Sequence, residues 1–259
     1  MRSMKVKNTA ITYTAYDYQT LQGVKLIAEW LRSPTKYKRV AFEADEDANE
    51  TPEGIDDIVG ERPDGIKDFW QVKFTPSPHK DENRLSWDWL LSVSGKTKRS
   101  RSILRKLYDA IVSVPAENLG DVVLLTNKLP DRDIEECLSD SKILFEKIDS
   151  VTKNLIANQL GSEKEAEYLF ARLTVQHSDG DYHVTKRSVQ AGLLHFSDDA
   201  GVERLISRSR EWAMFKNNPP GDGWIHLHHI REILSPRRPE PIPEIFFVPN
   251  DYCLPDAGV

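Results

Sequence analysis

The sequence is poor in cysteine and contains no long apolar run. Its two cysteines, Cys137 and Cys253, lie far apart and match neither a metal-binding nor a redox spacing. We therefore expect reduced thiols in a cytoplasmic protein. No apolar stretch approaches the roughly 20 residues that a membrane-spanning helix needs, so we expect no association with a membrane. The N-terminal stretch contains bases but not the apolar segment of a secretory signal.

An excess of positive charge is also missing. The 259 residues carry a formal net charge of −6, which argues against wholesale wrapping by nucleic acid. Between positions 43 and 57, however, every charged residue is an acid, and between 84 and 106 every charged residue except Asp88 is a base. An acidic centre beside a basic strip is typical of a metal-dependent enzyme that acts on a polyanion. Two solvated charge runs would have the same composition.

The hydrophobic periodicity predicts a compact α/β core in the first half of the chain. The order of elements is α-β-β-β-α-β. The expected ranges are a helix over 16–31, strands over 39–44, 55–59 and 69–74, a helix around 103–111 and a strand over 121–127.

We divide the chain into three segments on the basis of this pattern. Residues 1–130 form the core, and residues 131–235 form a helical C-terminal lobe of the same unit. Residues 236–259 are rich in proline and read as an extended linker or tail. A terminal linker is typical of a domain within a longer protein, and a free tail would look the same.

The strand in "DFWQVKFTPSP", residues 68–78, carries polar residues in its middle. Alternate residues of a strand share a face, so Gln71 and Lys73 point one way while Trp70, Val72 and Phe74 point the other. We expect the aromatic and aliphatic side chains to pack on the core. The glutamine and the lysine then face a cleft, where an unpaired lysine would be costly to bury. An anion should therefore lie nearby.

The preceding segments supply candidate anions. Asp56 and Asp57 lie in "IDDIVG", which a short turn joins to this strand, and Glu43 lies at the end of the strand before. If Ile58 is buried, Asp56 falls on the apolar face and Asp57 falls in the cleft. A frame shift or a bulge at Gly54 would reverse that assignment, so both aspartates remain candidates.

These side chains suit one kind of chemistry. Carboxylate and amide oxygens that converge from adjacent strands are suitable ligands for a hard divalent cation such as Mg²⁺. A lysine beside that ion can hold or activate an attacking water and can offset the charge that builds on a phosphate. The pattern therefore predicts metal-assisted hydrolysis of a phosphodiester.

The residues "GIDDIVG…FWQVKF" resemble the PD-(D/E)XK nuclease signature, in the variant in which glutamine replaces the second acid. "YDYQ", residues 16–19, and Glu43 make the chain similar to the N-terminal double-stranded DNA endonuclease domains of bacterial anti-phage effectors. Such domains occur in cyclic-oligonucleotide (CBASS-type) systems and in antiviral STAND ATPases (Avs-type). The resemblance covers roughly residues 13–127. It implies a restriction-endonuclease-like fold with a mixed central sheet flanked by helices.

The resemblance also implies roles for individual residues. Asp57 and Gln71 would bind Mg²⁺, for which Mn²⁺ would substitute, with Asp56 as the alternative to Asp57. Lys73 would be the catalytic lysine, Glu43 a further metal or water ligand, and Gln19 a neighbour of the site. The basic strip would contact the phosphates of double-stranded DNA through Lys96, Lys98, Arg99 and Arg101.

On this basis we expect a Mg²⁺-dependent DNA endonuclease that acts in bacterial antiviral defence. We expect it to work as a homo-oligomer, fused to a larger sensor or ATPase region. The alternative is a catalytically silent module with the same fold that binds DNA or mediates oligomerisation within a larger sensor. Trp87 and Trp89 flank the one acid of the basic strip. Either could stack on a nucleotide, although we expect core packing for at least one of them.

Overall fold

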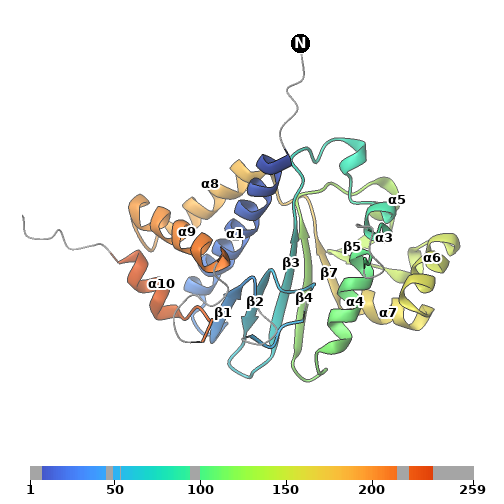
Figure 1. The fold of residues 1–259 in the computed structure, drawn as a ribbon, viewed down its shortest axis with the longest axis horizontal. Helices are drawn as coiled ribbons and strands as arrows, with labels where there is room; N and C mark the ends of the chain where they lie inside the picture. The colour runs from blue at the N-terminus through green and yellow to red at the C-terminus, as the bar shows by residue number, and fades with distance from the viewer. Residues whose placement is uncertain (1–7, 45–48, 53, 94–99, 215–221, 236–259) are drawn as a thin grey trace, which may run out of the picture.

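The computed structural model describes residues 8–44, 49–52, 54–93, 100–214 and 222–235. It is an α/β protein in which helices flank a five-stranded sheet with the strand order β1-β2-β3-β4-β7 (Figure 1). The strands are β1 (Arg39–Phe42), β2 (Ile58–Glu61), β3 (Lys67–Lys73), β4 (Leu119–Thr126) and β7 (Leu173–Gln176).

The sheet is mixed, as the sequence predicts. β2 runs antiparallel to both β1 and β3, whereas β4 lies parallel to both β3 and β7. Ile58 of β2 is opposite Trp70 of β3, and Lys73 at the end of β3 is opposite Thr126 at the end of β4. The carboxyl ends of β3 and β4 therefore meet at one edge of the sheet.

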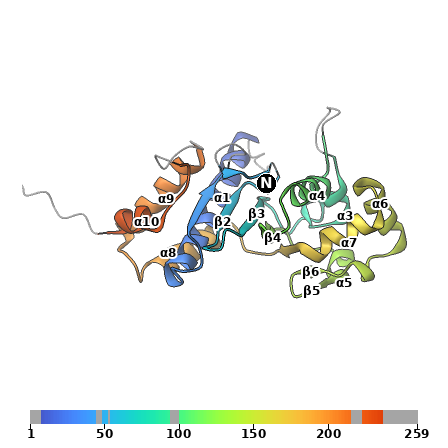
Figure 2. The ribbon, with the colours of Figure 1, turned by 90° about the horizontal axis from the view of Figure 1, so that it is seen from below.

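Helices cover both faces of the sheet (Figure 2). One group contains α1 (Asn8–Arg32), α8 (Tyr182–Leu193), α9 (Asp199–Met214) and α10 (Leu227–Leu234). The other group contains α3 (Trp87–Leu91), α4 (Ile103–Ser113), α5 (Arg132–Cys137), α6 (Ser150–Leu160) and α7 (Glu163–Arg172). Two 3-10 turns (Asp81–Asn83 and Phe145–Lys147) and a small hairpin of β5 (Leu138–Ser139) and β6 (Lys142–Ile143) complete the described elements.

The two helix groups enclose two hydrophobic cores, and β4 contributes to both. Val122 and Leu124 belong to the core under α4, and Val123 and Leu125 belong to the core under α1. Burial of both faces explains why this strand is a continuous apolar run instead of an alternating one. The sequence signal for β4 was therefore the clearest in the chain.

The predicted order of the first half is confirmed, with one strand shifted and one short helix, α3, that was not predicted. The strand expected over 55–59 is instead β2, which begins at Ile58 and continues to Glu61. Gly54 has a positive φ of 103°, and its N–H donates to the Asp56 carboxylate, so a turn occupies the expected start. At the other end, the Glu61 carboxylate forms a 2.6 Å ion pair with Arg39, which holds β2 against β1 beyond the predicted end.

Residues 131–235 are not only helical, because they contribute the fifth strand of the central sheet. The short run Leu173–Gln176 pairs with β4, a long-range contact that local periodicity does not reveal. The segment also divides between the two faces, since α8 and α9 pack on α1 while α6 and α7 pack near α4. The proposed tail, residues 236–259, lies outside the described residues. Within the described ranges, no helix has both the length and the apolar character needed to cross a bilayer.

Candidate active site

Asp57, Gln71 and Lys73 meet where β2 begins and β3 ends. Because Ile58 is opposite Trp70, Asp57 lies beside Gln71 on the sheet face that packs against α4. Oδ2 of Asp57 accepts a hydrogen bond from the Gln71 side-chain amide and a 2.6 Å hydrogen bond from the main-chain N–H of Val72. Nζ of Lys73 lies 3.8 Å from the same oxygen. The three predicted side chains thus form one cluster.

The geometry separates the two candidate aspartates. Asp57 is only 8% exposed and faces Gln71, whereas Asp56 is half-buried and its Oδ1 accepts from Gly54 N–H at 3.1 Å. Ile58 packs in the core under α1. Because neighbouring residues of a strand point to opposite faces, Asp57 then points toward the cleft. Of the two, Asp57 therefore has the position expected of a metal ligand beside Gln71.

Glu43 and Gln19 lie next to this cluster and bind each other. Glu43 follows β1, and its N–H donates to the Asp57 carbonyl oxygen at 3.0 Å. Its carboxylate accepts a hydrogen bond from the side-chain amide of Gln19 on α1. Glu43 is not among the residues that line the cavity described next. Glu43 therefore adjoins Asp57 through the main chain, and Gln19 joins through Glu43.

A cavity of about 500 Å³ opens beside the cluster, between the sheet and helices α3 and α4. Trp89, Ile103 and Leu107 supply apolar wall. The charged side chains that line the cavity are Asp56, Asp57, Lys73, Arg101, Lys106 and Lys128. Cations outnumber acids around this space, which suits an anionic ligand.

The donor set fits a hard divalent cation. Burial raises the pKa of Asp57, and Lys73 and the Val72 N–H offset the effect of burial only in part. The buried carboxylate is therefore short of positive charge. Asp57 offers carboxylate oxygens and Gln71 an amide oxygen, which are the ligand types that Mg²⁺ accepts when water and substrate phosphate supply the rest.

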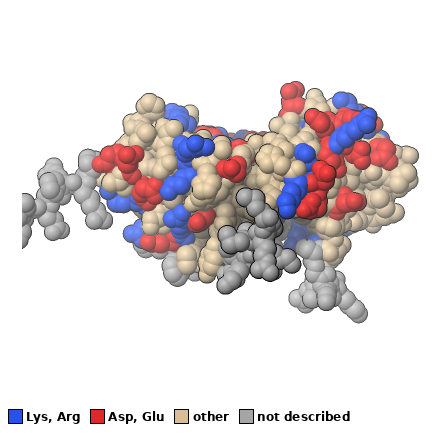
Figure 3. All heavy atoms as spheres, turned by 90° about the horizontal axis from the view of Figure 1, so that it is seen from above, with Lys and Arg blue, Asp and Glu red and all other residues tan. Residues whose placement is uncertain are grey.

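The predicted DNA-contacting strip is described only at Arg101, because Lys96, Lys98 and Arg99 lie outside the described residues. The exposed Arg101 lines the cavity and forms an ion pair with Asp109, which also binds Arg105 at 2.9 Å. Among the described residues on the face in Figure 3, basic and acidic side chains are interspersed.

Lys128 lines the cavity, although the sequence-based prediction assigned it no role in the site. Lys128 follows β4 and belongs to no repeating pattern of polar residues that would identify it as a site residue. The available signal was its position directly after a buried strand, at the same sheet edge as Lys73. Of the two tryptophans, Trp87 is buried in the core against Phe170, as expected for at least one of them, and Trp89 is half-buried at the cavity wall.

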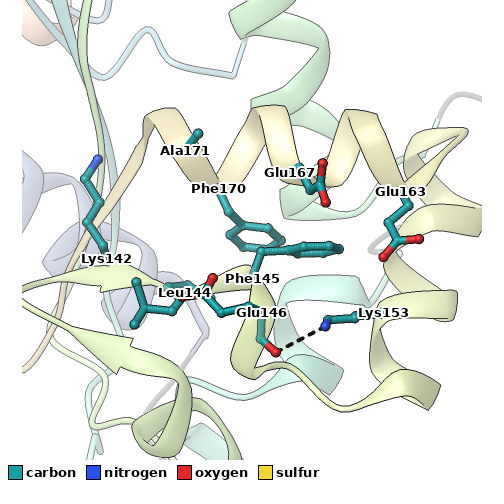
Figure 4. A pocket seen from close by; sticks show the side chains of 10 residues that line it. Lys142, Leu144, Phe145, Glu146, Lys153, Glu163, Glu167, Phe170 and Ala171 are labelled. Carbon is teal, nitrogen blue, oxygen red and sulfur yellow. Dashed lines mark hydrogen bonds between the residues drawn. The ribbon is translucent and has the colours of Figure 1, made fainter.

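A second cavity, of about 530 Å³, lies between β6, α6 and α7 (Figure 4). The rings of Phe145 and Phe170 stack in it with centroids 6.0 Å apart, and Lys153 lies 5.2 Å from the Phe145 centroid. Glu163 and Glu167 lie above this apolar centre. This second cavity shares no lining residue with the first cavity. Its lining residues include no side-chain amide, so it does not repeat the combination of Asp57, Gln71 and Lys73.

Comparison with known proteins adds no family assignment. No family model matches this sequence, and no curated protein sequence matches it. The function is therefore inferred from the residues and their geometry.

Proposed function

We propose that the protein is a metal-dependent endonuclease that hydrolyses phosphodiester bonds of double-stranded DNA, with a restriction-endonuclease-like core of the PD-(D/E)XK type. The observation that carries the proposal is the single cluster of Asp57, Gln71 and Lys73 at the edge of a mixed sheet. Support also comes from the order of the core elements and from the cationic cavity beside the cluster.

In this proposal, the chain's own groups hold the reacting partners. Asp57 and Gln71 would hold Mg²⁺ through their side-chain oxygens, and the ion would supply a Lewis acid that stabilises charge on the phosphate. Lys73 donates a hydrogen bond to the attacking water or to a phosphate oxygen, because its ammonium lies at the cavity and is held near the Asp57 carboxylate.

The biological setting is proposed from the sequence resemblance alone. An endonuclease that acts in bacterial antiviral defence must be inactive until it is triggered, and assembly into a homo-oligomer within a larger sensor or ATPase would provide that control. The proposal for the reaction does not depend on this setting.

The test is incubation of the chain at high concentration with linear and supercoiled plasmid, with Mg²⁺, Mn²⁺ or EDTA. We expect metal-dependent cleavage by the wild type and a loss of at least about 10²-fold for Lys73→Ala, the usual scale for removal of one group that stabilises a transition state. Lys25→Ala is the matched control. Its side chain is 37% exposed and pairs with Asp179, while that of Lys73 is 38% exposed and pairs with Asp57.

The alternative is a silent module that binds DNA without cutting it, served by the same cationic cavity. Under that alternative, neither metal nor Lys73→Ala changes the state of the plasmid, while binding persists in a gel-shift assay. Cleavage that survives Lys73→Ala but not EDTA would contradict the role given to this lysine.

A further inference from the structure

Lys128 is a buried lysine in the candidate cavity. It lies two residues after the end of β4, is 6% exposed, and lines the same cavity as Asp57 and Lys73. Its Nζ donates a 2.6 Å hydrogen bond to the carbonyl oxygen of Asn83 and lies 4.9 Å from the ring centroid of Trp89.

Among the residues that the structure describes, no acid compensates this ammonium. Burial alone lowers the pKa of Lys128 from its ordinary 10.5 to about 8, without an opposing effect of a carboxylate. A buried cation without an anion is unfavourable, and a sequence with no use for the charge could place methionine or leucine there. The missing anion is therefore expected from a ligand.

The main chain around Lys128 is fixed from several sides. The Lys128 N–H donates to Thr126 Oγ1 at 3.2 Å, and its carbonyl oxygen accepts from Ser178 N–H at 3.1 Å. The Asn127 side chain holds Thr75 by hydrogen bonds of 2.8 and 2.7 Å to its main-chain N–H and carbonyl oxygen. The ammonium is thus held in advance of binding, so a ligand would lose little free energy in ordering it.

The composition of the cavity indicates which anion is suitable. Lys73, Arg101 and Lys106 line the same space, so its cations outnumber its two acids, Asp56 and Asp57. The Asp57 carboxylate is already engaged by Gln71, Val72 and Lys73. A ligand with more than one anionic group, such as a sugar-phosphate backbone, matches several cations around a single cavity better than one small anion does.

We infer that Lys128 binds a backbone phosphate of the nucleic acid inside this cavity, beside the phosphodiester that the proposed nuclease would cleave. This inference rests on the proposed function, because it takes the substrate to be DNA. It assigns Lys128 to substrate binding and leaves the reacting phosphate to Asp57, Gln71 and Lys73. The Trp89 ring, at the cavity wall beside Nζ, limits the directions in which the ammonium can point.

The test measures binding of a labelled double-stranded oligonucleotide to the full chain over a series of NaCl concentrations, with Ca²⁺ in place of Mg²⁺ so that the DNA stays intact. For Lys128→Met we expect about tenfold weaker binding, as for the loss of one charge-assisted hydrogen bond. The slope of log Kd against log[NaCl] should fall by about one, since one phosphate contact is lost. Lys128→Arg should retain the slope.

Lys142→Met is the matched control. Lys142 is also a partly buried lysine whose pKa is lowered mainly by burial, and its Nζ binds two main-chain carbonyl oxygens, those of Arg172 and Leu173, each at 3.2 Å. It lies in the second cavity and should leave both the affinity and the slope unchanged. The slope is informative even if a variant folds incompletely, because an inactive fraction changes the apparent affinity and not the salt dependence.

The outcomes for this inference and for the proposed function can be told apart. A wild type that binds with a Lys128-dependent slope but does not cleave in Mg²⁺ contradicts the nuclease and supports the inference. A wild type that cleaves, together with a Lys128→Met variant that keeps the wild-type slope and affinity, overturns the inference alone. Inorganic phosphate that binds through Lys128 while the oligonucleotide slope is unchanged also overturns it, in favour of a free phosphate ion.

Discussion

Nζ of Lys73 lies 3.8 Å from Oδ2 of Asp57, and the N–H of the intervening residue, Val72, donates to that oxygen at 2.6 Å. The Gln71 amide binds the same oxygen. Three successive residues of one strand therefore converge on a single carboxylate oxygen of its neighbour. This arrangement leaves Oδ1 of Asp57 outside these three contacts, and substitutions at Asp57 and Gln71 should have separable effects on stability and on metal binding.

Asp57→Asn should remove metal-dependent stabilisation without unfolding the protein. Because burial raises the pKa of Asp57, a neutral side chain is favoured there in the absence of metal, and the asparagine oxygen can still accept from Val72 N–H. We expect an equal or higher Tm without Mg²⁺. At about 100 times Kd, Mg²⁺ should stabilise the wild type by about 2.7 kcal/mol and the variant by nothing measurable.

Asp56→Asn is the control for this prediction, measured by thermal unfolding in the same Mg²⁺ series. Asp56 also lines the cavity, but its carboxylate accepts from Gly54 N–H and makes no contact with Gln71. Its variant should keep the increase in Tm. If Asp56→Asn loses the Mg²⁺ response and Asp57→Asn keeps it, the other aspartate is the ligand.

Gln71→Glu should strengthen metal binding and weaken the metal-free protein. A second carboxylate next to buried Asp57 adds like-charge repulsion and removes a hydrogen bond, which we expect to lower the free energy of unfolding by about 1–3 kcal/mol without metal. With Mg²⁺ the added anionic ligand should restore stability and lower Kd by about tenfold. Urea unfolding with and without Mg²⁺ measures the first effect, and calorimetric titration measures the second.

Gln22→Glu separates a metal effect from simple repulsion. Gln22 is 3% exposed and donates to the Asp179 carboxylate at 2.5 Å, so it reproduces the glutamine–aspartate contact away from the cavity. We expect a comparable loss of stability that Mg²⁺ does not reverse. Equal rescue of both variants by Mg²⁺ would mean that the ion acts by general screening.

The residues that the sequence identified are those whose positions follow from a local period. Gln71 and Lys73 share a face because a strand repeats every two residues, and Asp57 follows from Ile58 by the same alternation. The glutamine and the lysine were therefore placed correctly although the start of β2 was shifted. The sequence left Asp56 open because the turn at Gly54, which sets the register, has no periodic signal.

Features that depend on long-range contacts were not predictable in this way. The strand Leu173–Gln176 belongs to the sheet only because β4 offers it a free edge. Helix α8 lies in the segment predicted to be helical, but its packing on α1, from far along the chain, had no local signal. Lys128 joins the site for the same reason, since parallel pairing of β3 and β4 brings their carboxyl ends together.

Asp68→Ala should destabilise the fold strongly without changing metal binding. Asp68 is 2% exposed and lies at the far end of β3 from Lys73. Its carboxylate accepts from Arg62 at 2.6 and 3.0 Å, from Tyr37 Oη at 3.2 Å and from Asp121 N–H at 2.9 Å. Removing one partner leaves buried groups unpaired, for which we expect a loss of about 3–5 kcal/mol in urea unfolding.

Asp64→Ala is the control for Asp68→Ala, because Asp64 is exposed and its carboxylate accepts a turn hydrogen bond from Ile66 N–H at 3.1 Å. It should cost less than about 1 kcal/mol. Mg²⁺ should stabilise the folded fraction of both variants as it does the wild type. If Asp68→Ala loses the Mg²⁺ response at temperatures where it is folded, the Arg62–Asp68 ion pair is not independent of the metal site.

Lys128 should give the stability of the protein a specific dependence on alkaline pH. Its pKa is about 8 in the folded chain, below the ordinary 10.5 of an unfolded lysine. Between these values the unfolded state binds more protons than the folded state, so the free energy of unfolding rises with pH, by up to about 1.4 kcal/mol per pH unit from this group. Below pH 8 the lysine is charged in both states, and its buried charge is a constant penalty.

The measurement is urea unfolding of the wild type and Lys128→Met from pH 7 to 11 in the absence of nucleic acid. The difference between the two proteins cancels the other titrating groups, including the tyrosines. We expect the variant to be the more stable one at pH 7 and the difference to shrink as the pH rises through about 8 to 10.5. A difference that stays constant over this window would mean that Lys128 titrates normally, and that its ammonium is already compensated before any phosphate binds.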